Sequence, residues 1–227
     1  MIQARNMRRK VSARVNLFWL NITSNYIIID LGIDCDVLIL SEKQLISDFD
    51  CGNADLNEFF NQDALKYKRQ MLSQTCFFQL ISSGKVVCAF SFSASSIKTS
   101  DLPGSRRKKV KEYVPREKTL KSYPGIIIGR LGVATEFNSQ GVGSKLIEFI
   151  RDFCIANFPD FVRFLLVDAY NEPEVVGFYQ KNKFTTVFST EEHEKENYRQ
   201  SPSETLRTRY MFYDMLQWRD KIIEKSA

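Results

Sequence analysis

The stretch that most constrains this chain runs from residue 126 to residue 150, where an apolar run leads through a glycine loop into residues at helical spacing. Residues 126–133 have strand character, and from Leu146 onward the apolar residues follow a helical pattern. The loop contains Gly141 and Gly143, which lack a Cβ atom and let a bulky anion approach the main chain closely. Because this loop ends at a helix N-terminus, the pattern predicts a site for a pyrophosphate group.

The glycine spacing excludes the two most common phosphate-binding loops. The G-x-G-x-x-G pattern would need glycine where Leu146 stands, and G-x-x-x-x-G-K-[ST] is absent. Residues 138–143 read NSQGVG, which is similar to the acyl-CoA loop [QR]-x-x-G-x-[GA] of the GNAT superfamily of N-acetyltransferases. Asn138 replaces the first Gln or Arg of that pattern, whereas the main-chain part of the loop needs only the glycines. The same residues also fit an ordinary strand–turn–helix connection.

A second motif lies further along the chain, where residues 171–184 read NEPEVVGFYQKNKF. This segment is similar to the GNAT pattern N-x-x-A-x-x-F-Y-x-x-x-G-F, in which an asparagine precedes a helix carrying an aromatic–tyrosine pair. Lys183 replaces the usual glycine, so the turn after the helix needs Asn182 or Lys183 at positive φ. The two motifs together identify the chain as similar to the GNAT superfamily.

The expected order of elements also resembles GNAT topology, as β-α-α-β-β-β-α-β-α-β-β between residues 37 and 216. The resemblance implies an α/β (α+β) GNAT fold, with a mixed sheet of six to seven strands that splays between strands 4 and 5 and is flanked by about four helices. We expect an acetyltransferase domain over residues 36–217, with a basic insertion at 98–124. Residues 1–35 would form an N-terminal extension and residues 218–227 a C-terminal tail. A short helix starting at Ser41 and a charged loop over residues 190–206 are also expected.

The resemblance implies a site for acetyl-CoA as co-substrate and a direct transfer of its acetyl group to a primary amine. Tyr179 would protonate the departing CoA sulfur. The implied cofactor-binding residues are Leu131, Gly132, Val133, Asn138, Ser139, Gln140, Gly141, Val142, Gly143, Ser144, Asn171 and Phe178. The general base stays open among Asp168, Glu136 and a water. Cys51 is a weaker candidate nucleophile, because direct transfer needs no acyl-enzyme.

Three segments, over residues 49–64, 129–146 and 167–184, resemble more narrowly the GNAT-type toxins of bacterial toxin–antitoxin pairs. That resemblance implies the α-amine of aminoacyl-tRNA as acceptor, a ribbon-helix-helix antitoxin as partner, and a homodimer as one assembly. The insertion is strongly basic, and Arg106, Arg107, Lys108 and Lys109 are candidate contacts to phosphates of a nucleic acid. The same basic block also fits a solvated loop.

Two alternatives to the toxin interpretation stay open. One is a GNAT enzyme that acetylates a small-molecule or protein amine. The other is a catalytically degenerate CoA-binding or interaction module, because Asn138 and Lys183 depart from the family pattern.

Composition narrows the remaining function classes. At 227 residues and 44% hydrophobic, the chain fits one large folded domain with appendages. Its five cysteines are odd in number and lack C-x-x-C spacing, which favours a reducing cytoplasm. His193 is the only histidine, so neither a histidine-rich metal site nor a Ser-His-Asp triad is expected. No stretch has the pattern of a transmembrane helix or signal peptide, so we expect no membrane contact.

Overall fold

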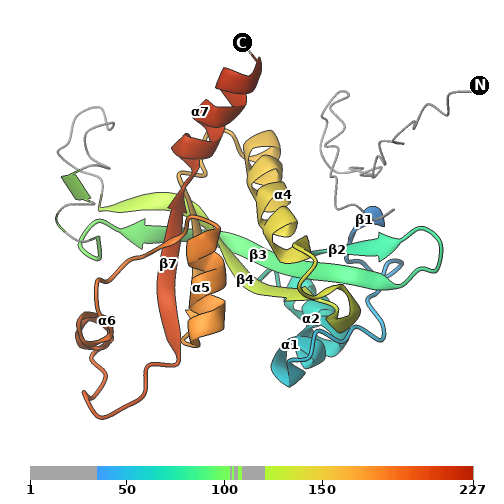
Figure 1. Ribbon diagram of the computed structural model, residues 1–227, viewed down its shortest axis with the longest axis horizontal. Helices are drawn as coiled ribbons and strands as arrows, with labels where there is room; N and C mark the ends of the chain where they lie inside the picture. The colour runs from blue at the N-terminus through green and yellow to red at the C-terminus, as the bar shows by residue number, and fades with distance from the viewer. Residues whose placement is uncertain (1–34, 103, 105–106, 109–120, 227) are drawn as a thin grey trace, which may run out of the picture. The chain divides into compact units, whose positions relative to one another are not determined.

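The computed structural model describes residues 35–102, 104, 107–108 and 121–226 (Figure 1). The described chain divides into two compact units. Unit 1 is made of Met1–Phe90 and Leu131–Asp152, and unit 2 of Ser91–Arg130 and Phe153–Ala227. The expected N-terminal extension lies almost wholly outside the described residues.

Seven strands form one hydrogen-bonded series in the order β1-β2-β3-β4-β5-β7-β6. β1 (Cys35–Ile39) pairs antiparallel with β2 (Gln74–Leu80), and β4 (Ser122–Val133) pairs parallel with β5 (Phe164–Tyr170). β7 (Thr208–Asp214) then pairs antiparallel with β5. The sheet is therefore mixed.

Unit 1 contains β1, β2, the first part of β3 (Val86–Lys98) and the last part of β4. Its helical segments are α1 (Ala54–Glu58), the π-helical turn η1 (Phe59–Asp63), α2 (Ala64–Arg69), the short 3-10 turn η2 (Thr135–Phe137) and most of α4 (Val142–Asn157). The first three follow one another without a break, and their apolar side chains join a core with Leu40, Phe49, Phe77 and Ala134. Burial of this aromatic-rich face is the main force that stabilises the short helices.

The described part of unit 2 contains β5, β7 and the two-residue β6 (Thr185–Thr186). It also contains the helices α5 (Pro173–Lys181), α6 (Glu191–Tyr198) and α7 (Met215–Ser226). α5 packs on β5 (Figure 1). Leu102, Phe164, Leu166 and Phe212 belong to a separate core cluster, so each unit has its own apolar interior.

Three local expectations are wrong. The helix expected at Ser41 does not form; instead Ser41 and Gln44 make a tight antiparallel bridge. The charged loop expected after residue 190 contains α6, whose N-cap Thr190 accepts a hydrogen bond from the main chain of His193. The last strand gives way to helix α7, which includes nearly all of the expected C-terminal tail.

None of the helices in the described part of the chain is long and apolar enough to cross a membrane.

Candidate active site

The last residues of β4 present main-chain amides on an edge that no other strand uses. β4 and β5 pair from Gly125–Phe164 only as far as Ile128–Val167. At the far end, Ala134 donates its main-chain N–H to Val87 of β3 at 2.8 Å. Because successive residues of a strand point their amides to opposite sides, Leu131 and Val133 direct theirs away from β3. Such an edge can pair with the amides of an extended ligand such as pantetheine.

The loop after β4 is shaped by two residues in the left-handed region. Ser139 has φ of 62° and Gly141 has φ of 79°, whereas Asn138 is extended. The side chain of Gln140 donates to the carbonyl of Glu136 at 2.9 Å, which bends the loop back on the turn η2. A Cβ atom at Gly141 would meet no atom within 4 Å, so this glycine is required by the backbone conformation and not by crowding.

The N-terminus of α4 lies at the end of this loop, as the sequence predicts. Its first turn closes where Lys145 donates to the carbonyl of Gly141 at 3.2 Å. The amides of Val142 and Gly143 precede that bond, in the first turn, where main-chain N–H groups have no carbonyl four residues earlier within the helix. Such donors together with the helix dipole make a suitable site for a phosphate group. Seven predicted cofactor residues, from Asn138 to Ser144, therefore form one continuous loop and helix start in unit 1.

Gly132 packs closely against the segment that precedes α1. A Cβ at this position would lie 3.1 Å from the Phe49 ring and 3.2 Å from the Cys51 sulfur. Asn61 fixes Phe49, because its amide bonds both the main-chain N–H and the carbonyl of that residue at 3.0 and 2.8 Å. Asn57 accepts from the Cys51 main-chain N–H at 2.9 Å. This tightly held segment therefore supports the last residues of β4.

These asparagines were not singled out from the sequence, although their regular spacing indicates that they share one side of a helix. Asn53, Asn57 and Asn61 recur every four residues and so share one side of the helical segment. Asn53 caps α1 by accepting from Leu56, and the other two bond the preceding loop.

Two side chains considered for catalysis are engaged in other contacts. The Cys51 thiol donates to the Asn57 side chain at 3.2 Å, and burial raises its pKa. A raised pKa lowers the thiolate fraction, which argues against a nucleophile. The Glu136 carboxylate pairs with Lys85 at 2.6 Å. This ion pair ties the carboxylate to a lysine.

Tyr179 lies in unit 2 on the buried side of α5. Its side chain is 6% exposed, and its ring contacts Phe178 and Phe184 edge-on at 5.1 and 5.4 Å between centroids. Burial raises the pKa of the phenol well above its usual value near 10. The group therefore stays protonated over the physiological range, as a hydrogen-bond donor to a thiolate must.

Asn171 follows β5 and holds the chain that enters β7. Its main-chain N–H donates to the Arg207 carbonyl at 2.9 Å, and its side chain donates to the Leu206 carbonyl at 3.0 Å. Asn171 therefore braces the segment that leads into β7.

Asp168 stands on β5 directly opposite Tyr210 of β7. Although the residue is exposed, desolvation raises the pKa of its carboxyl, which would make it a stronger base when ionised. Burial, with added repulsion from Asp168, raises the pKa of Tyr210 to about 12. A raised pKa is compatible with the general-base role considered for Asp168.

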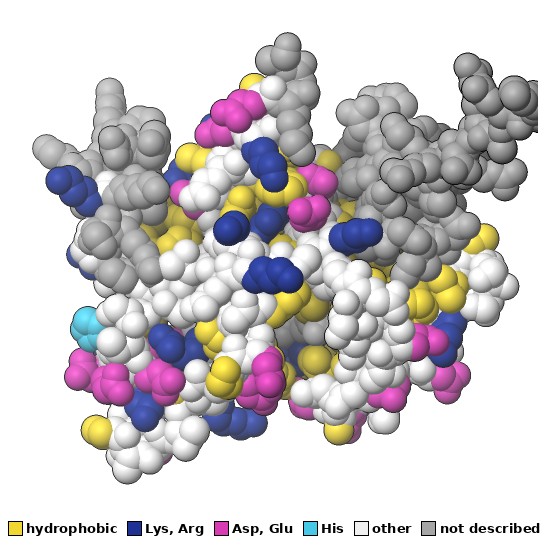
Figure 2. Space-filling view, viewed as in Figure 1, with side chains coloured by type: hydrophobic (Ala, Val, Ile, Leu, Met, Phe, Trp, Pro, Cys, Tyr) yellow, Lys and Arg dark blue, Asp and Glu magenta, His cyan; other side chains and the backbone are white. Residues whose placement is uncertain are grey.

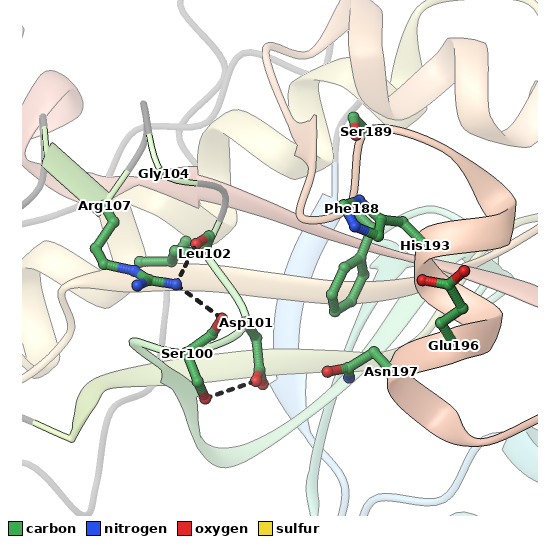
Figure 3. A pocket seen from close by; sticks show the side chains of 10 residues that line it. All are labelled: Ser100, Asp101, Leu102, Gly104, Arg107, Phe188, Ser189, His193, Glu196 and Asn197. Atoms are coloured by element: carbon green, nitrogen blue, oxygen red, sulfur yellow. Dashed lines mark hydrogen bonds between the residues drawn. The ribbon is translucent and has the colours of Figure 1, made fainter.

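Only part of the basic insertion can be placed. Arg106 and Lys109 lie outside the described residues, and Lys108 is exposed. The Arg107 guanidinium donates to the carbonyls of Ser100 and Leu102 at 3.0 and 3.1 Å, so it braces its own loop (Figure 3). Among the described residues, no group of three or more His, Cys, Asp or Glu side chains is arranged to hold a metal ion.

No protein-family model matches the chain, and no curated protein matches it significantly. Solved structures do match it. AtaT complexed with acetyl-methionyl-tRNAfMet has a TM-score of 0.64 at 18% identity, over 83% of this chain and 99% of that chain. A KacT mutant has a TM-score of 0.63 at 16% identity, over 85% and 99%. The chain has the GNAT fold.

A third match is a mutant of the AtaT toxin bound to acetyl-CoA and to the C-terminus of the antitoxin AtaR. It has a TM-score of 0.57 at 17% identity, over 81% of this chain and 95% of that chain. At identities this low, the matches establish the fold alone. The mixed sheet that the resemblance implies is present, and its strands β4 and β5 are parallel.

Proposed function

We propose that this protein is an acetyl-CoA-dependent N-acetyltransferase that acts on a primary amine. The observation that carries the proposal is the start of α4, where a loop held by Gly141 at φ of 79° leads the amides of Val142 and Gly143 into the first turn of the helix. Support also comes from matched GNAT structures whose titles name acetyl-CoA as the bound molecule.

The proposed chemistry gives each group one task. The α4 N-terminus binds the diphosphate of CoA, and the outer edge of β4 pairs with pantetheine. The neutral amine attacks the thioester carbonyl carbon while a strand N–H donates to the developing oxyanion. The carbon–sulfur bond then breaks, the amine loses its proton to water or a carboxylate, and the thiolate is protonated by Tyr179.

Radiolabelled acetyl transfer to total tRNA, proteins and polyamines, measured in parallel, tests this proposal. We expect label in one of the three acceptor pools and its loss in Tyr179→Phe. Binding of acetyl-CoA without transfer to any pool would favour the degenerate CoA-binding module instead.

For the acceptor, the first candidate is the α-amine of aminoacyl-tRNA. One matched structure is titled as a complex with acetyl-methionyl-tRNAfMet, and the insertion of this chain is rich in Lys and Arg. The second candidate is a small-molecule or protein amine.

Substitutions at Lys108 and Arg107 distinguish a tRNA acceptor from a small-molecule or protein amine. Lys108 is exposed, so Lys108→Glu should lower tRNA affinity, with a shallower salt dependence, and leave stability unchanged. Arg107→Ala should reduce stability as well, because it removes two hydrogen bonds to the main chain. A tRNA affinity that neither variant changes would count against the nucleic-acid acceptor.

A ribbon-helix-helix antitoxin and a homodimer remain proposed partners. One matched toxin structure is titled as bound to the C-terminus of an antitoxin. A search for a small ribbon-helix-helix reading frame immediately upstream, followed by co-expression and size-exclusion chromatography with light scattering, tests the antitoxin. The same chromatography of the protein alone tests the homodimer.

A further inference from the structure

A four-residue segment before α1, residues 49–52 with the sequence FDCG, has no task in the acetyl transfer proposed above. Acidic and basic side chains are interspersed over the face shown in Figure 2, so charge alone gives little guidance to a further site there. The FDCG segment stands out instead by its hydrogen bonds and close packing. Each of its four residues takes part in a hydrogen bond.

Asn57 holds the middle of the FDCG segment. Its side-chain oxygen accepts from the main-chain N–H of Cys51 at 2.9 Å, and its side-chain nitrogen donates to the Asp50 carboxylate at 2.7 Å. The same carboxylate oxygen accepts from the main-chain N–H of Gly52 at 2.9 Å. The bonds from Gly52 and Asn57 lower the pKa of the Asp50 carboxyl, so the group that closes this turn stays charged.

Asn61, four residues later, holds the first residue of the segment. Its side chain accepts from the main-chain N–H of Phe49 and donates to the carbonyl of the same residue. The Phe49 ring is buried and contacts the Phe60 ring edge-on at 5.4 Å between centroids. Because both rings belong to the apolar core of unit 1, the FDCG segment cannot move without disturbing that core.

The segment contacts the end of β4 at two points. At Gly132, an added Cβ would lie 3.1 Å from the Phe49 ring and 3.2 Å from the Cys51 sulfur. Just past the strand, Thr135 donates its main-chain N–H to the Asp50 carbonyl at 3.0 Å. These two points are three residues apart, so the main chain between them is held on both sides.

The main-chain amides that flank Gly132 belong to Leu131 and Val133, and both point away from β3. They form the edge that the proposed function assigns to pantetheine. A displacement of Gly132 would move both amides together. Since a hydrogen bond weakens steeply as its geometry departs from linearity, the position of the FDCG segment controls how well this edge can pair with a ligand.

We propose that Asn57 and Asn61 are positioning residues for acetyl-CoA. Each acts through the FDCG segment, which fixes Gly132 and with it the outer edge of β4, and neither touches the ligand. The inference rests on the proposed function, because that function supplies the ligand at this edge. It assigns the two asparagines to binding of the pantetheine arm and not of the diphosphate, which binds at the start of α4.

Calorimetric titration with two ligands tests the inference. One is acetyl-CoA, and the other is adenosine 3′-phosphate 5′-diphosphate, which is coenzyme A without its pantetheine arm. Asn57→Ala and Asn61→Ala should each bind acetyl-CoA about fivefold more weakly, the size of one lost hydrogen bond, and bind the nucleotide as the wild type does. Gly132→Ala, which places a methyl group against the FDCG segment, should show the same pattern.

Asn53→Ala is the matched control. Asn53 lies on the same side of the helical segment, but its side chain caps α1 by accepting from the Leu56 main chain. We expect loss of this cap to lower the melting temperature and to leave the affinity for both ligands unchanged. Thermal melts show which variants are folded, and Gly132→Ala provides the comparison if an asparagine variant does not fold.

Unchanged acetyl-CoA affinity in the folded asparagine variants would overturn the inference. An equal loss of affinity for the nucleotide, or the same loss in Asn53→Ala, would also overturn it, because the effect would then not be specific to the pantetheine edge. In each of these cases the wild type still binds acetyl-CoA, so the proposed function stands. Failure of the folded wild type to bind either ligand would instead overturn the proposed function, and the positioning role with it.

Discussion

Gly141 and Gly177 both have open space where a Cβ would stand, but their backbones differ. Gly141 has φ of 79°, whereas Gly177 lies inside α5. We expect Gly141→Ala to lower the free energy of unfolding by about 1 kcal/mol, because a Cβ is strained in the left-handed region. Gly177→Ala should raise it by about 0.5–1 kcal/mol, because alanine favours a helix interior. Urea unfolding curves measure both changes, and equal shifts would contradict the loop conformation.

Tyr179 differs from other buried tyrosines in its proposed contact with the CoA sulfur. Tyr179→Phe keeps the ring contacts, so acetyl-CoA affinity and stability should change little, while kcat falls on the order of 10²-fold. Tyr123, which is 4% exposed in the core of unit 2, provides the matched control. Steady-state kinetics of Tyr179→Phe and Tyr123→Phe measure this difference in kcat. An equal loss of kcat in both variants would mean that the effect comes from packing and not from the phenol.

At the scale of elements, the end of α5 shows how a short motif fixes a turn. Lys183 donates to the Gln180 carbonyl at 2.8 Å, and Phe184 donates to the Tyr179 carbonyl at 2.9 Å. This pattern needs a residue at positive φ, and Lys183 has φ of 67°. The expectation that Asn182 or Lys183 would take that conformation is confirmed, with Lys183 the residue concerned.

Lys183→Gly should therefore stabilise the protein. Glycine removes the strain of a side chain in the left-handed region, which we expect to raise the free energy of unfolding by about 1 kcal/mol. Lys181→Gly, at the last helical position of α5, should lower the free energy of unfolding, because glycine is unfavourable in a helix. A destabilised Lys183→Gly protein in urea unfolding would show that this turn is held in another way.

α6 is joined to β7 through one fully buried carboxylate. Glu194 accepts from the Arg209 side chain at 2.7 Å and from the Tyr210 main chain at 2.6 Å. Glu194→Gln keeps an acceptor but removes the charge opposite Arg209. We expect a loss of about 2 kcal/mol in the free energy of unfolding. The control Glu204→Gln, in an exposed loop, should change the free energy of unfolding by no more than about 0.5 kcal/mol. An equal effect of the two substitutions would contradict the importance of the buried contact.

Helix α6 also shows why part of unit 2 escaped prediction. Its sequence EEHEKENY has too few apolar residues for a helical stripe, so periodicity indicates a loop. The helix is held by its cap at Thr190 and by the contact of Glu194 with β7, and the second of these is a long-range contact. The Thr190 cap could have been recognised in the sequence, whereas the buried ion pair of Glu194 with Arg209 depends on the tertiary structure.

At the scale of the whole molecule, most elements along the chain and the glycine loop before α4 were predictable because they depend on local pattern, whereas the order of strands in the sheet depends on long-range pairing. Alternating or continuous apolar runs indicate strands, and the glycines at 141 and 143 mark the turn into α4. The asparagines that hold the segment before α1 are an intermediate case. Their four-residue spacing is visible in the sequence, but their hydrogen-bond partners depend on the folded structure.

The central claim is that the start of α4 binds the diphosphate of coenzyme A. The most direct measurement is calorimetric titration of acetyl-CoA into the wild type, Gly141→Ala and Gly177→Ala. The account predicts saturable one-to-one binding by the wild type, unchanged affinity in Gly177→Ala, and about tenfold weaker binding in Gly141→Ala, whose loop amides are displaced. No binding by folded wild-type protein, or the same affinity in all three, would contradict it.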